Sequence, residues 1–497
     1  MNSASELLGV ANAAWPVESS VMLLPGRVEG WPAGTQRAAN AAERLLSQAV
    51  AWWDVGQYRD GDRFLRNRGT GAELLDLRLG SALAPNSNDP LFLPVDDRGY
   101  VYLPGVASNF LSVPDEAALD ITGDIDIRAQ VALDDWTPSA TQLILSKLNN
   151  TGDQRSYTVN IRTTGVVRLS WSTDGAGTVN ADSTVAPTVA DGAALWVRAT
   201  LDVDNGASGY DVKFFTSSDG VTWTQLGTTV TGVGVTSIFA STTAVRLGQD
   251  FGSTVMAGKF YRAQVLNGID GTTVLDIDCD AITSGSATTF TALTGQTVTI
   301  NRSTSGRKSV AVPDRANRGA SVMLLGADDY LEVQDNWQHG LLNFRQGDSF
   351  TVVAVIRQWA TPITNRAIVG KYDATGIAGY RLRQSATAFA TVAEIGSGGS
   401  SANDVGTSTS SGTLASYAAV ADRSANVITA YANGTPSGSP TNIAAIGSLV
   451  TTQPLYVGRA DTAIFTETEF YAAAIFRRAL SPAEITALSN YFTGRIA

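Results

Sequence analysis

Residues 470–485 read Phe-Tyr-Ala-Ala-Ala-Ile-Phe-Arg-Arg-Ala-Leu-Ser-Pro-Ala-Glu-Ile. The first half predicts a strand, and the second half predicts the start of a helix. Ser481 is a suitable N-cap, Pro482 occupies the first helical position, and Glu484 completes a capping box. Apolar residues then recur on one face of this helix: Ile485, Leu488 and Phe492. The segment therefore predicts a final strand followed by one short helix that packs by a single face.

Short apolar or alternating segments recur along the chain before this terminal segment. They include Val101-Tyr-Leu, Ile125-Asp-Ile-Arg-Ala-Gln-Val, Val166-Val-Arg-Leu-Ser-Trp and Val352-Val-Ala-Val-Ile. Clusters of Gly, Asn, Asp and Ser separate them. Many short strands with turn signals between them predict an all-β sandwich or barrel.

Several of these motifs occur twice in the same order. The pairs are Phe110-Leu-Ser-Val with Tyr330-Leu-Glu-Val, Gly123-Asp with Gly347-Asp, Ile144-Leu-Ser-Lys with Ile368-Val-Gly-Lys, and Arg246-Leu-Gly with Tyr456-Val-Gly. Their spacing drifts by small amounts, which loops accept and core strands do not. We therefore expect two copies of one domain. The predicted ranges are an N-terminal arm and helix over 1–49, a first sandwich over 50–270, a β connector over 271–315, and a second sandwich with a C-terminal helix over 316–497.

The predicted N-terminal helix covers residues 35–49, which are rich in Ala, Leu, Gln, Glu and Arg. These residue types favour helix, and Thr35 is an acceptable N-cap. Leu45, Leu46 and Ala49 fall on one side of it. The helix therefore packs either on this chain or on a neighbouring subunit.

The overall composition argues against several classes of function. The chain has 497 residues and a formal net charge of −11, which argues against a protein that tracks nucleic-acid phosphates. No apolar run approaches the roughly 18 residues of a membrane span, so we expect no membrane insertion. Cys279 and His339 are the only residues of their kinds, which rules out an intrachain disulfide and most catalytic arrangements. The first residues lack a basic export signal, so we expect folding in the cytoplasm.

Four segments together carry a resemblance to a known superfamily. They are Val50-Ala-Trp-Trp-Asp, Tyr330-Leu-Glu-Val, Ser349-Phe-Thr-Val-Val-Ala-Val-Ile and residues 470–485. With them, the chain resembles the concanavalin A-like lectin/glucanase superfamily, in its laminin G-like or pentraxin-like branch. The resemblance implies a mainly β fold with two antiparallel jelly-roll sandwiches in tandem. The first copy departs from the pattern, because the strand that begins at Tyr261 is not followed by a helix signal.

The N-terminal segment carries a second resemblance. Asp62-Arg-Phe-Leu-Arg-Asn-Arg-Gly-Thr-Gly and Leu75-Asp-Leu-Arg-Leu-Gly are similar to segments of minor tail proteins of phages that infect Actinobacteria. This similarity implies a virion tail protein that assembles in the host cytoplasm. Its implied partners are other tail proteins and a host cell-wall glycan or surface receptor. The similarity also implies a homo-oligomer, with the trimer as the common form.

Glycan-hydrolysing sandwiches place three carboxylates at alternating positions of one strand, because residues i and i+2 share a face. The nearest runs here are Glu467-Thr-Glu and Asp124-Ile-Asp, and each lacks the third acidic residue. Asp276 and Asp278 also alternate, flanked by apolar residues, and the alternative for all three runs is that they are charges at strand edges that face solvent. His339 lies in a polar stretch, and the chain has no Gly-x-Ser-x-Gly motif. We therefore predict no catalytic residue.

Calcium is the metal that the sequence favours, because a hard cation takes oxygen ligands and related domains hold it at the rim of the sandwich. The candidate ligands occur at equivalent points of the two copies: Asp202, Asp204, Asp250, Asp422 and Asp461. The alternative is that these residues only form turns, in which Asp and Asn are common.

Trp136 and Trp359 follow matched strands in corresponding loops. An aromatic ring offers the face on which the apolar side of a sugar stacks, so this pair is the candidate ligand site. The alternative is that each Trp seals the end of a sandwich core.

These observations predict a non-enzymatic phage tail protein that displays lectin-like domains for attachment to a host surface or glycan. A purely architectural tail subunit that docks other tail proteins is the first alternative. A glycan-degrading tail enzyme is the second, and the missing acidic triplet argues against it.

Overall fold

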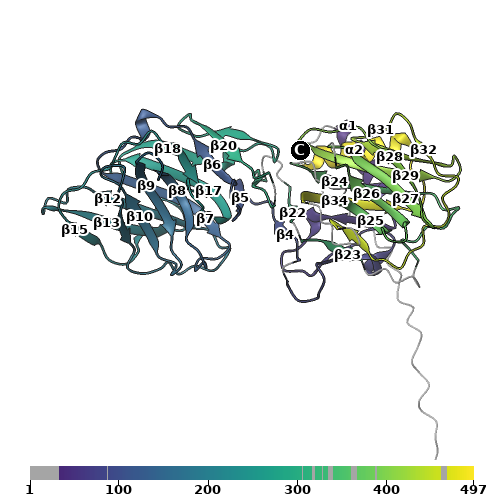
Figure 1. The fold of residues 1–497 in the computed structure, drawn as a ribbon, viewed down its shortest axis with the longest axis horizontal. Helices are drawn as coiled ribbons and strands as arrows, with labels where there is room; N and C mark the ends of the chain where they lie inside the picture. Colours follow the sequence, from purple (N-terminus) through teal and green to yellow (C-terminus); the bar gives the residue numbers. More distant parts are fainter. Residues whose placement is uncertain are drawn as a thin grey trace, which may run out of the picture.

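The structure is a computed structural model, and it describes residues 33–496 with short gaps. The gaps are residues 87, 305, 316–319, 327, 334–339, 360–365, 387–388 and 460–466. Over this range the chain forms two β-sandwiches that lie side by side (Figure 1). The predicted mainly β fold with antiparallel sandwiches is confirmed.

The first sandwich consists of an eight-stranded sheet and a nine-stranded sheet. In bonding order, the eight-stranded sheet contains β11 (Val179–Asp182), β10 (Val167–Trp171), β9 (Gln154–Ile161), β8 (Gln142–Asn149), β16 (Val245–Leu247), β6 (Phe110–Val113), β20 (Thr297–Asn301) and β19 (Thr289–Thr291). The other sheet contains β14 (Thr224–Gln225), β13 (Gly209–Ser217), β12 (Leu195–Asp202), β7 (Ile125–Leu133), β17 (Ala257–Asn267), β5 (Tyr100–Pro104) and β21 (Val310–Val312), with β15 (Val230–Val233) beside β13 and β18 (Thr272–Asp278) beside β17.

The second sandwich has the same arrangement of an eight-stranded and a nine-stranded sheet. Its eight-stranded sheet contains β2 (Phe64–Leu65), β3 (Leu77–Leu79), β23 (Leu331–Val333), β33 (Leu455–Val457), β25 (Arg366–Asp373), β26 (Ala378–Gln384), β27 (Thr391–Ser397) and β28 (Ser400–Val405). Its nine-stranded sheet contains β31 (Thr435–Pro436), β30 (Val427–Ala432), β29 (Leu414–Asp422), β24 (Phe350–Arg357), β34 (Thr468–Phe476), β22 (Val322–Leu325) and β4 (Leu91–Leu93), with β1 (Ala51–Asp54) beside β34 and β32 (Thr441–Asn442) beside β30.

Short 3₁₀ turns and two α-helices complete the described chain. The elements are η1 (Val55–Gln57), η2 (Ala72–Leu75), η3 (Ala117–Leu119), η4 (Cys279–Ala281), α1 (Ala33–Leu46) and α2 (Pro482–Ile496).

The N-terminal strands pair differently from the predicted ranges. β1 bonds to β34, β3 to β23 and β4 to β22, so residues 51–93 complete the sheets of the second sandwich. The predicted connector also differs, because β18 bonds to β17, β20 to β6 and β21 to β5 within the first sandwich. Strands that are close in sequence usually pair with each other. Here β1, β3 and β4 pair instead with strands far along the chain, and only β2 pairs with its neighbour β3.

The first sandwich is therefore an insertion between two parts of the second. The chain leaves the second sandwich after β4 and returns to it at β22 (Figure 1). The Arg315 N–H donates to the Asp96 carbonyl at 2.9 Å, so the entering and leaving segments lie next to each other. Closely spaced ends are typical of domains inserted into other domains.

The C-terminal strand and helix form as the sequence predicts. The Ser481 N–H donates to Glu484 Oε2 at 2.8 Å, and the Glu484 N–H donates to Ser481 Oγ at 3.4 Å, which is the reciprocal pattern of a capping box. The predicted apolar face of α2 is buried: Ile485, Leu488 and Phe492. α1 packs against α2, and Tyr491 Oη donates to Glu43 Oε1 at 3.1 Å. The N-terminal helix thus contacts this chain's own C-terminal helix.

Equivalent contacts in the two sandwiches support the internal repeat. Lys147 on β8 and Lys371 on β25 are both fully buried, and each ammonium binds a carbonyl oxygen, that of Ser241 or Gln453. Lys147 lies opposite Tyr157 in the sheet, as Lys371 lies opposite Tyr380. These matches set the residue-by-residue equivalence between the two eight-stranded sheets.

Candidate functional site

An open polar cavity lies on the outer face of the eight-stranded sheet of the first sandwich. Side chains alternate between the faces of a strand, so Tyr157, Val159 and Ile161 of β9 enter the core while Thr158 and Asn160 point outward. The same alternation sends Leu169 of β10 inward and its neighbours outward. We call the outward hollow across β8 to β11 the groove.

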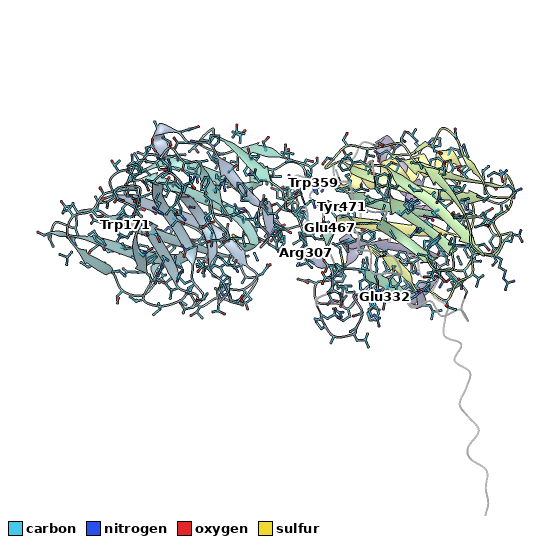
Figure 2. All side chains as sticks on the ribbon, viewed as in Figure 1. Trp171, Arg307, Glu332, Trp359, Glu467 and Tyr471 are labelled. Atoms are coloured by element: carbon cyan, nitrogen blue, oxygen red, sulfur yellow. The ribbon has the colours of Figure 1, made fainter. Side chains whose placement is uncertain are left out.

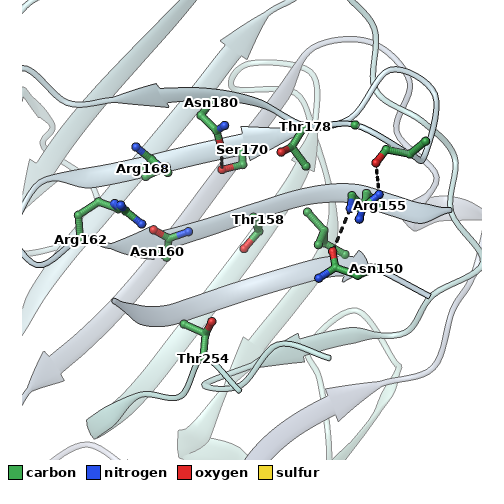
Figure 3. A pocket seen from close by; sticks show the side chains of 13 residues that line it. Asn150, Arg155, Thr158, Asn160, Arg162, Arg168, Ser170, Thr178, Asn180 and Thr254 are labelled. Carbon is green, nitrogen blue, oxygen red and sulfur yellow. Dashed lines mark hydrogen bonds between the residues drawn. The ribbon is translucent and has the colours of Figure 1, made fainter. Parts of the chain in front are cut away.

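The groove has a volume of about 610 Å³. Its lining is mostly hydroxyl, amide and guanidinium groups: Asn150, Arg155, Thr158, Asn160, Arg162, Arg168, Ser170, Thr178, Asn180 and Thr254, together with Leu148, Ala176 and Gly177. Figure 3 shows Asn160, Arg162 and Arg168 near one end and Asn150 and Arg155 near the other. Thr158 and Ser170 lie between the two ends, on neighbouring strands.

Hydrogen bonds hold part of the lining in place. Ser170 Oγ donates to Asn180 Oδ1 at 2.7 Å, and Arg155 Nε donates to Asn150 Oδ1 at 2.9 Å (Figure 3). The Asn160 Oδ1 atom has no hydrogen-bond partner in the described protein and is shielded from solvent.

One ion pair stiffens the end of the groove that carries Asn160. Arg168 donates to both oxygens of Asp182 across β10 and β11, at 2.5 and 2.7 Å. These hydrogen bonds, and then the positive charges of Arg168 and Arg162, lower the pKa of Asp182 below its usual value. The pair therefore stays ionised at neutral pH and fixes the Arg168 side chain along the sheet.

An arginine between two aromatic rings lies on β16, the strand next to β8. The Arg246 guanidinium carbon is 4.5 Å from the centre of the Phe110 ring and 3.6 Å from that of Phe251. Arg246 also donates to the Asp250 carbonyl at 3.1 Å, and burial lowers its pKa. Arg246 lies opposite Ser146 of β8, and the loop that contains Phe251 continues to Thr254 of the groove. This cluster is an aromatic surface beside the groove along the sheet.

The equivalent face of the second sandwich is filled. The register of the strands makes Thr158 equivalent to Arg381 and Ser170 equivalent to Glu394. Arg381 Nε and Arg383 Nε both donate to Glu394 Oε2, at 2.9 Å for the Arg381 bond. Tyr372 Oη adds a bond to Glu394 Oε1 at 3.0 Å. Long paired side chains thus occupy the space that short ones leave open in the first sandwich.

Trp136 does not face the groove. Its side chain is only 3% exposed and belongs to the core of the first sandwich, where Nε1 donates to the Ala193 carbonyl at 3.3 Å. The structure therefore places Trp136 where the core-sealing alternative expects it, and the buried ring offers no open face to a sugar.

Trp359 lies at the junction of the two sandwiches (Figure 2). Its Nε1 donates to Glu469 Oε1 at 2.7 Å, and the Arg302 guanidinium carbon lies 3.6 Å from the centre of the ring. Burial lowers the pKa of Arg302 to about 10. One face of this ring is therefore covered by a residue of the first sandwich, so Trp136 and Trp359 do not form a shared stacking surface.

The candidate calcium ligands occupy separate turns. Asp202 and Asp204 accept from backbone N–H groups two residues ahead, as does Asp250 from Gly252. Asp422 does the same with Ser424, whose hydroxyl also donates to it, and the hydroxyl bond, followed by the backbone bonds, lowers the pKa of Asp422. Asp461 lies outside the described residues. Over the ranges that the structure describes, no group of three or more His, Cys, Asp and Glu side chains is arranged to hold a metal ion.

The acidic pairs considered for catalysis are held in ion pairs. Glu469 is buried and binds Arg357 and Tyr471, and Asp126 binds Arg128 and Arg198. Asp276 and Asp278 both bind Arg262. His339 lies outside the described residues. Among the helices of the described chain, none is long and apolar enough to cross a membrane.

The groove residues were missed by the reading of the sequence. The groove has a sequence signal in residues 154–162 and 167–170, where polar residues occupy every second position. A solvent-facing strand shows the same pattern. Only the register of three strands shows that Thr158, Ser170 and Asn180 meet on one surface.

Residues 325–486 match the family model of the concanavalin A-like lectin/glucanases superfamily. No curated protein matches the chain. Similar solved structures include the binding domain of Paraclostridial mosquitocidal protein 1, with 16% identity and a TM-score of 0.30 over 35% of this chain and 44% of that one. Alignment with this domain thus spans less than half of its length.

Two further solved structures are similar at comparable levels. Domains LG4-5 of the mouse laminin α1 chain match with 12% identity and a TM-score of 0.30, over 81% of this chain and 96% of that one. A protein of Bacteroides ovatus described as carbohydrate binding matches with 11% identity and a TM-score of 0.29, over 42% of this chain and 58% of that one. The chain is thus mainly β and contains a domain of the concanavalin A-like lectin/glucanase superfamily.

Proposed function

We propose that this chain is a non-enzymatic glycan-binding protein and that the groove of the first sandwich is its ligand site. The observation that carries the proposal is the row of hydroxyl and amide groups across β8 to β11, left open by Thr158 and Ser170. A sugar presents many hydroxyl groups that both donate and accept, and Asn, Ser and Thr side chains match them. No Asp or Glu lines the groove among the described residues, so it lacks the carboxylate pair that glycoside hydrolysis requires.

The groove supports binding by hydrogen bonds rather than by stacking on tryptophan. Asn160 and Asn180 each carry a carboxamide at the surface of the groove, and the fixed strands hold these groups in place. Rigid positioning lowers the entropy lost when a ligand binds. The aromatic side chains Phe110 and Phe251 beside the groove already cover the Arg246 guanidinium.

The test is a glycan array with the full chain, followed by titration of each hit. Asn180→Ala removes a groove carboxamide and is expected to weaken binding about tenfold, the effect of one or two lost hydrogen bonds. Asn403→Ala is the matched control, because Asn403 occupies the equivalent place opposite Glu394 in the second sandwich and is exposed. This control is expected to bind like the wild type. An array with no hits would overturn the proposal and favour the purely architectural role.

We further propose that the protein is part of a phage tail, assembled in the host cytoplasm and used for attachment to the host surface. Support comes from the sequence resemblance of residues 62–71 and 75–80 to minor tail proteins. Other tail proteins and a further copy of this chain, in a homo-oligomer, are the proposed partners. Antibody labelling of purified particles, seen by electron microscopy, is expected to mark the tail. Label confined to the capsid, or absent from particles, would contradict this placement.

A further inference from the structure

We infer that the ligand of the groove carries anionic groups, and that Arg162 binds one of them. This inference rests on the proposed function and names the class of glycan, an acidic polysaccharide. The starting observation is that the groove is lined by three arginines and, over the described residues, by no carboxylate.

The three arginines differ in how their charge is balanced. Arg168 forms a bidentate ion pair with Asp182, so its charge is compensated. Arg162 donates to the Thr141 hydroxyl at 3.1 Å, and no carboxylate lies within ion-pair distance of it in the described chain. The positive charge of Arg162 also lowers the pKa of Asp182, but less than Arg168 does. A single hydroxyl partner leaves most of the five guanidinium N–H groups of Arg162 free to bind a ligand.

Arg155 supplies a second uncompensated charge at the opposite end of the groove. It donates to Asn150 Oδ1 and to the Ala176 carbonyl, which are both neutral acceptors (Figure 3). The chain as a whole has a formal net charge of −11, so the positive charge of the groove is opposite in sign to the net charge of the protein. Two like charges on one open face attract a ligand with repeated negative charges, and repel a cationic one.

The equivalent face of the second sandwich shows what a compensated version looks like. Its arginines, Arg381 and Arg383, converge on Glu394, which accepts from both. Their hydrogen bonds, opposed by burial, lower the pKa of Glu394, so this cluster is ionised and internally balanced. The equivalent positions of the first sandwich carry Thr158, Asn160 and Ser170, which are all uncharged. The arginines of the groove lie at other positions, and no carboxylate of the described chain pairs with Arg162 as Glu394 pairs with Arg381 and Arg383.

A guanidinium binds carboxylates and phosphates through paired, charge-assisted hydrogen bonds. Both groups occur in acidic polysaccharides, either as sugar carboxylates or as phosphodiesters between units. Both groups present an oxyanion, which is the group that Arg162 and Arg155 would bind. The test therefore uses one probe of each kind and a neutral partner for comparison.

The experiment is isothermal titration of the full chain with three polymers. Polygalacturonate supplies carboxylates, its fully methyl-esterified form is the neutral match, and poly(glycerol phosphate) supplies phosphodiesters. At least one anionic polymer is expected to bind at least about tenfold more tightly than the methyl ester, and more weakly as salt rises. Binding of only one of the two anionic polymers identifies the source of the oxyanion.

Variants assign the effect to the groove. Arg162→Gln is expected to weaken binding of the anionic polymer about tenfold, and Arg162→Lys to recover part of the loss, because charge returns without the planar fork. Arg315→Gln removes one charge from an exposed arginine outside the groove and is the matched control. Thermal unfolding of each variant confirms that it is folded.

The outcomes separate this inference from the proposed function. Equal binding of the polygalacturonate and its methyl ester, with Arg162→Gln unchanged and Asn180→Ala weakened, overturns the inference and retains a neutral-glycan groove. No binding of any polymer, together with a glycan array without hits, overturns both.

Discussion

The open surface of the first sandwich and the filled surface of the second differ at one pair of facing residues in each sheet. Thr158 and Ser170 face each other on β9 and β10, as Arg381 and Glu394 do on β26 and β27. The backbone positions are equivalent, so the difference lies in the side chains alone. Thr158 Oγ1 bonds back to the Leu145 carbonyl at 2.9 Å and leaves the space above it free.

A lysine is buried at the equivalent position of each eight-stranded sheet, Lys147 and Lys371. Its contribution to stability can be measured by substitution. The Lys147 ammonium is fully buried and lies 2.6 Å from Asp115 Oδ1 and 3.1 Å from Asp120 Oδ1. Lys147→Ala leaves two partly exposed carboxylates without their cation and is expected to lower the free energy of unfolding by about 3 kcal/mol. Urea unfolding measures this loss.

Lys213→Ala is the control for that variant, because Lys213 on β13 forms no ion pair among the described residues and is partly exposed. It is expected to change the free energy of unfolding by less than about 0.5 kcal/mol. Equal effects of the two substitutions would show that the ion pairs of Lys147 contribute nothing.

At the scale of elements, the strongest local signals are the ones that formed as predicted. Residues 470–485 predict β34 and the start of α2, because a capping box and an apolar face act within a few residues. Arg478 strengthens this helix start by donating to both oxygens of Glu484, at 3.0 and 2.7 Å. The cap thus has a charged partner that the sequence pattern alone did not reveal.

The pH dependence of this cap is a prediction for α2. The hydrogen bonds from Arg478 hold the pKa of Glu484 at about 2, below its usual value near 4.5. A carboxyl with a lowered folded-state pKa stabilises the fold above its unfolded pKa, and this contribution is lost as the pH falls from about 4.5 towards 2. Glu484→Gln is expected to cost about 1 kcal/mol at pH 7. Urea unfolding as a function of pH is expected to show that this difference shrinks below pH 4.5, whereas a constant difference would contradict the assignment.

The sequence does not predict which distant strands pair with each other. The sequence pattern assigns Val50-Ala-Trp-Trp-Asp to the first sandwich, but β1, with Trp53 fully buried, bonds to β34 at the other end of the chain. Strand patterns fix which face is buried but not which strand is the neighbour. The same limit applies to the site: Thr158, Ser170 and Asn180 become neighbours only through the register of β9, β10 and β11. Trp136 follows its strand as predicted, but only packing shows that its ring enters the core.

At the scale of the whole molecule, the second sandwich is built from two separated parts of the chain around an inserted first sandwich. Side chains also join the two bodies. The Gly306 N–H donates to Glu467 Oε2 at 3.0 Å, and Arg307 binds both oxygens of Asp329 (Figure 2). Together with Arg302 on Trp359, these contacts link the base of the groove-bearing sandwich to the second one.

This topology predicts which fragments fold. A fragment of residues 96–315 contains all strands of the first sandwich and is expected to unfold cooperatively. A fragment of residues 316–497 lacks β1 to β4 and exposes the apolar faces that they cover, so it is expected to stay unfolded or to aggregate. Circular dichroism during urea titration distinguishes these states.

The matched control joins residues 33–95 to 320–497 through a short Gly-Ser linker, which the adjacency of Asp96 and Arg315 permits. This chain is expected to fold, because it restores every strand of the second sandwich. Cooperative unfolding of the 316–497 fragment alone would contradict the inserted arrangement.

Short side chains leave the groove open, and we propose that glycan binds there for this reason. One double variant tests this most directly. Thr158→Arg with Ser170→Glu copies the Arg381–Glu394 pair into the first sandwich at facing positions. Titration of this double variant with the best glycan from the array is expected to show no binding, while its thermal unfolding stays close to that of the wild type. Undiminished binding by the folded double variant would contradict the claim.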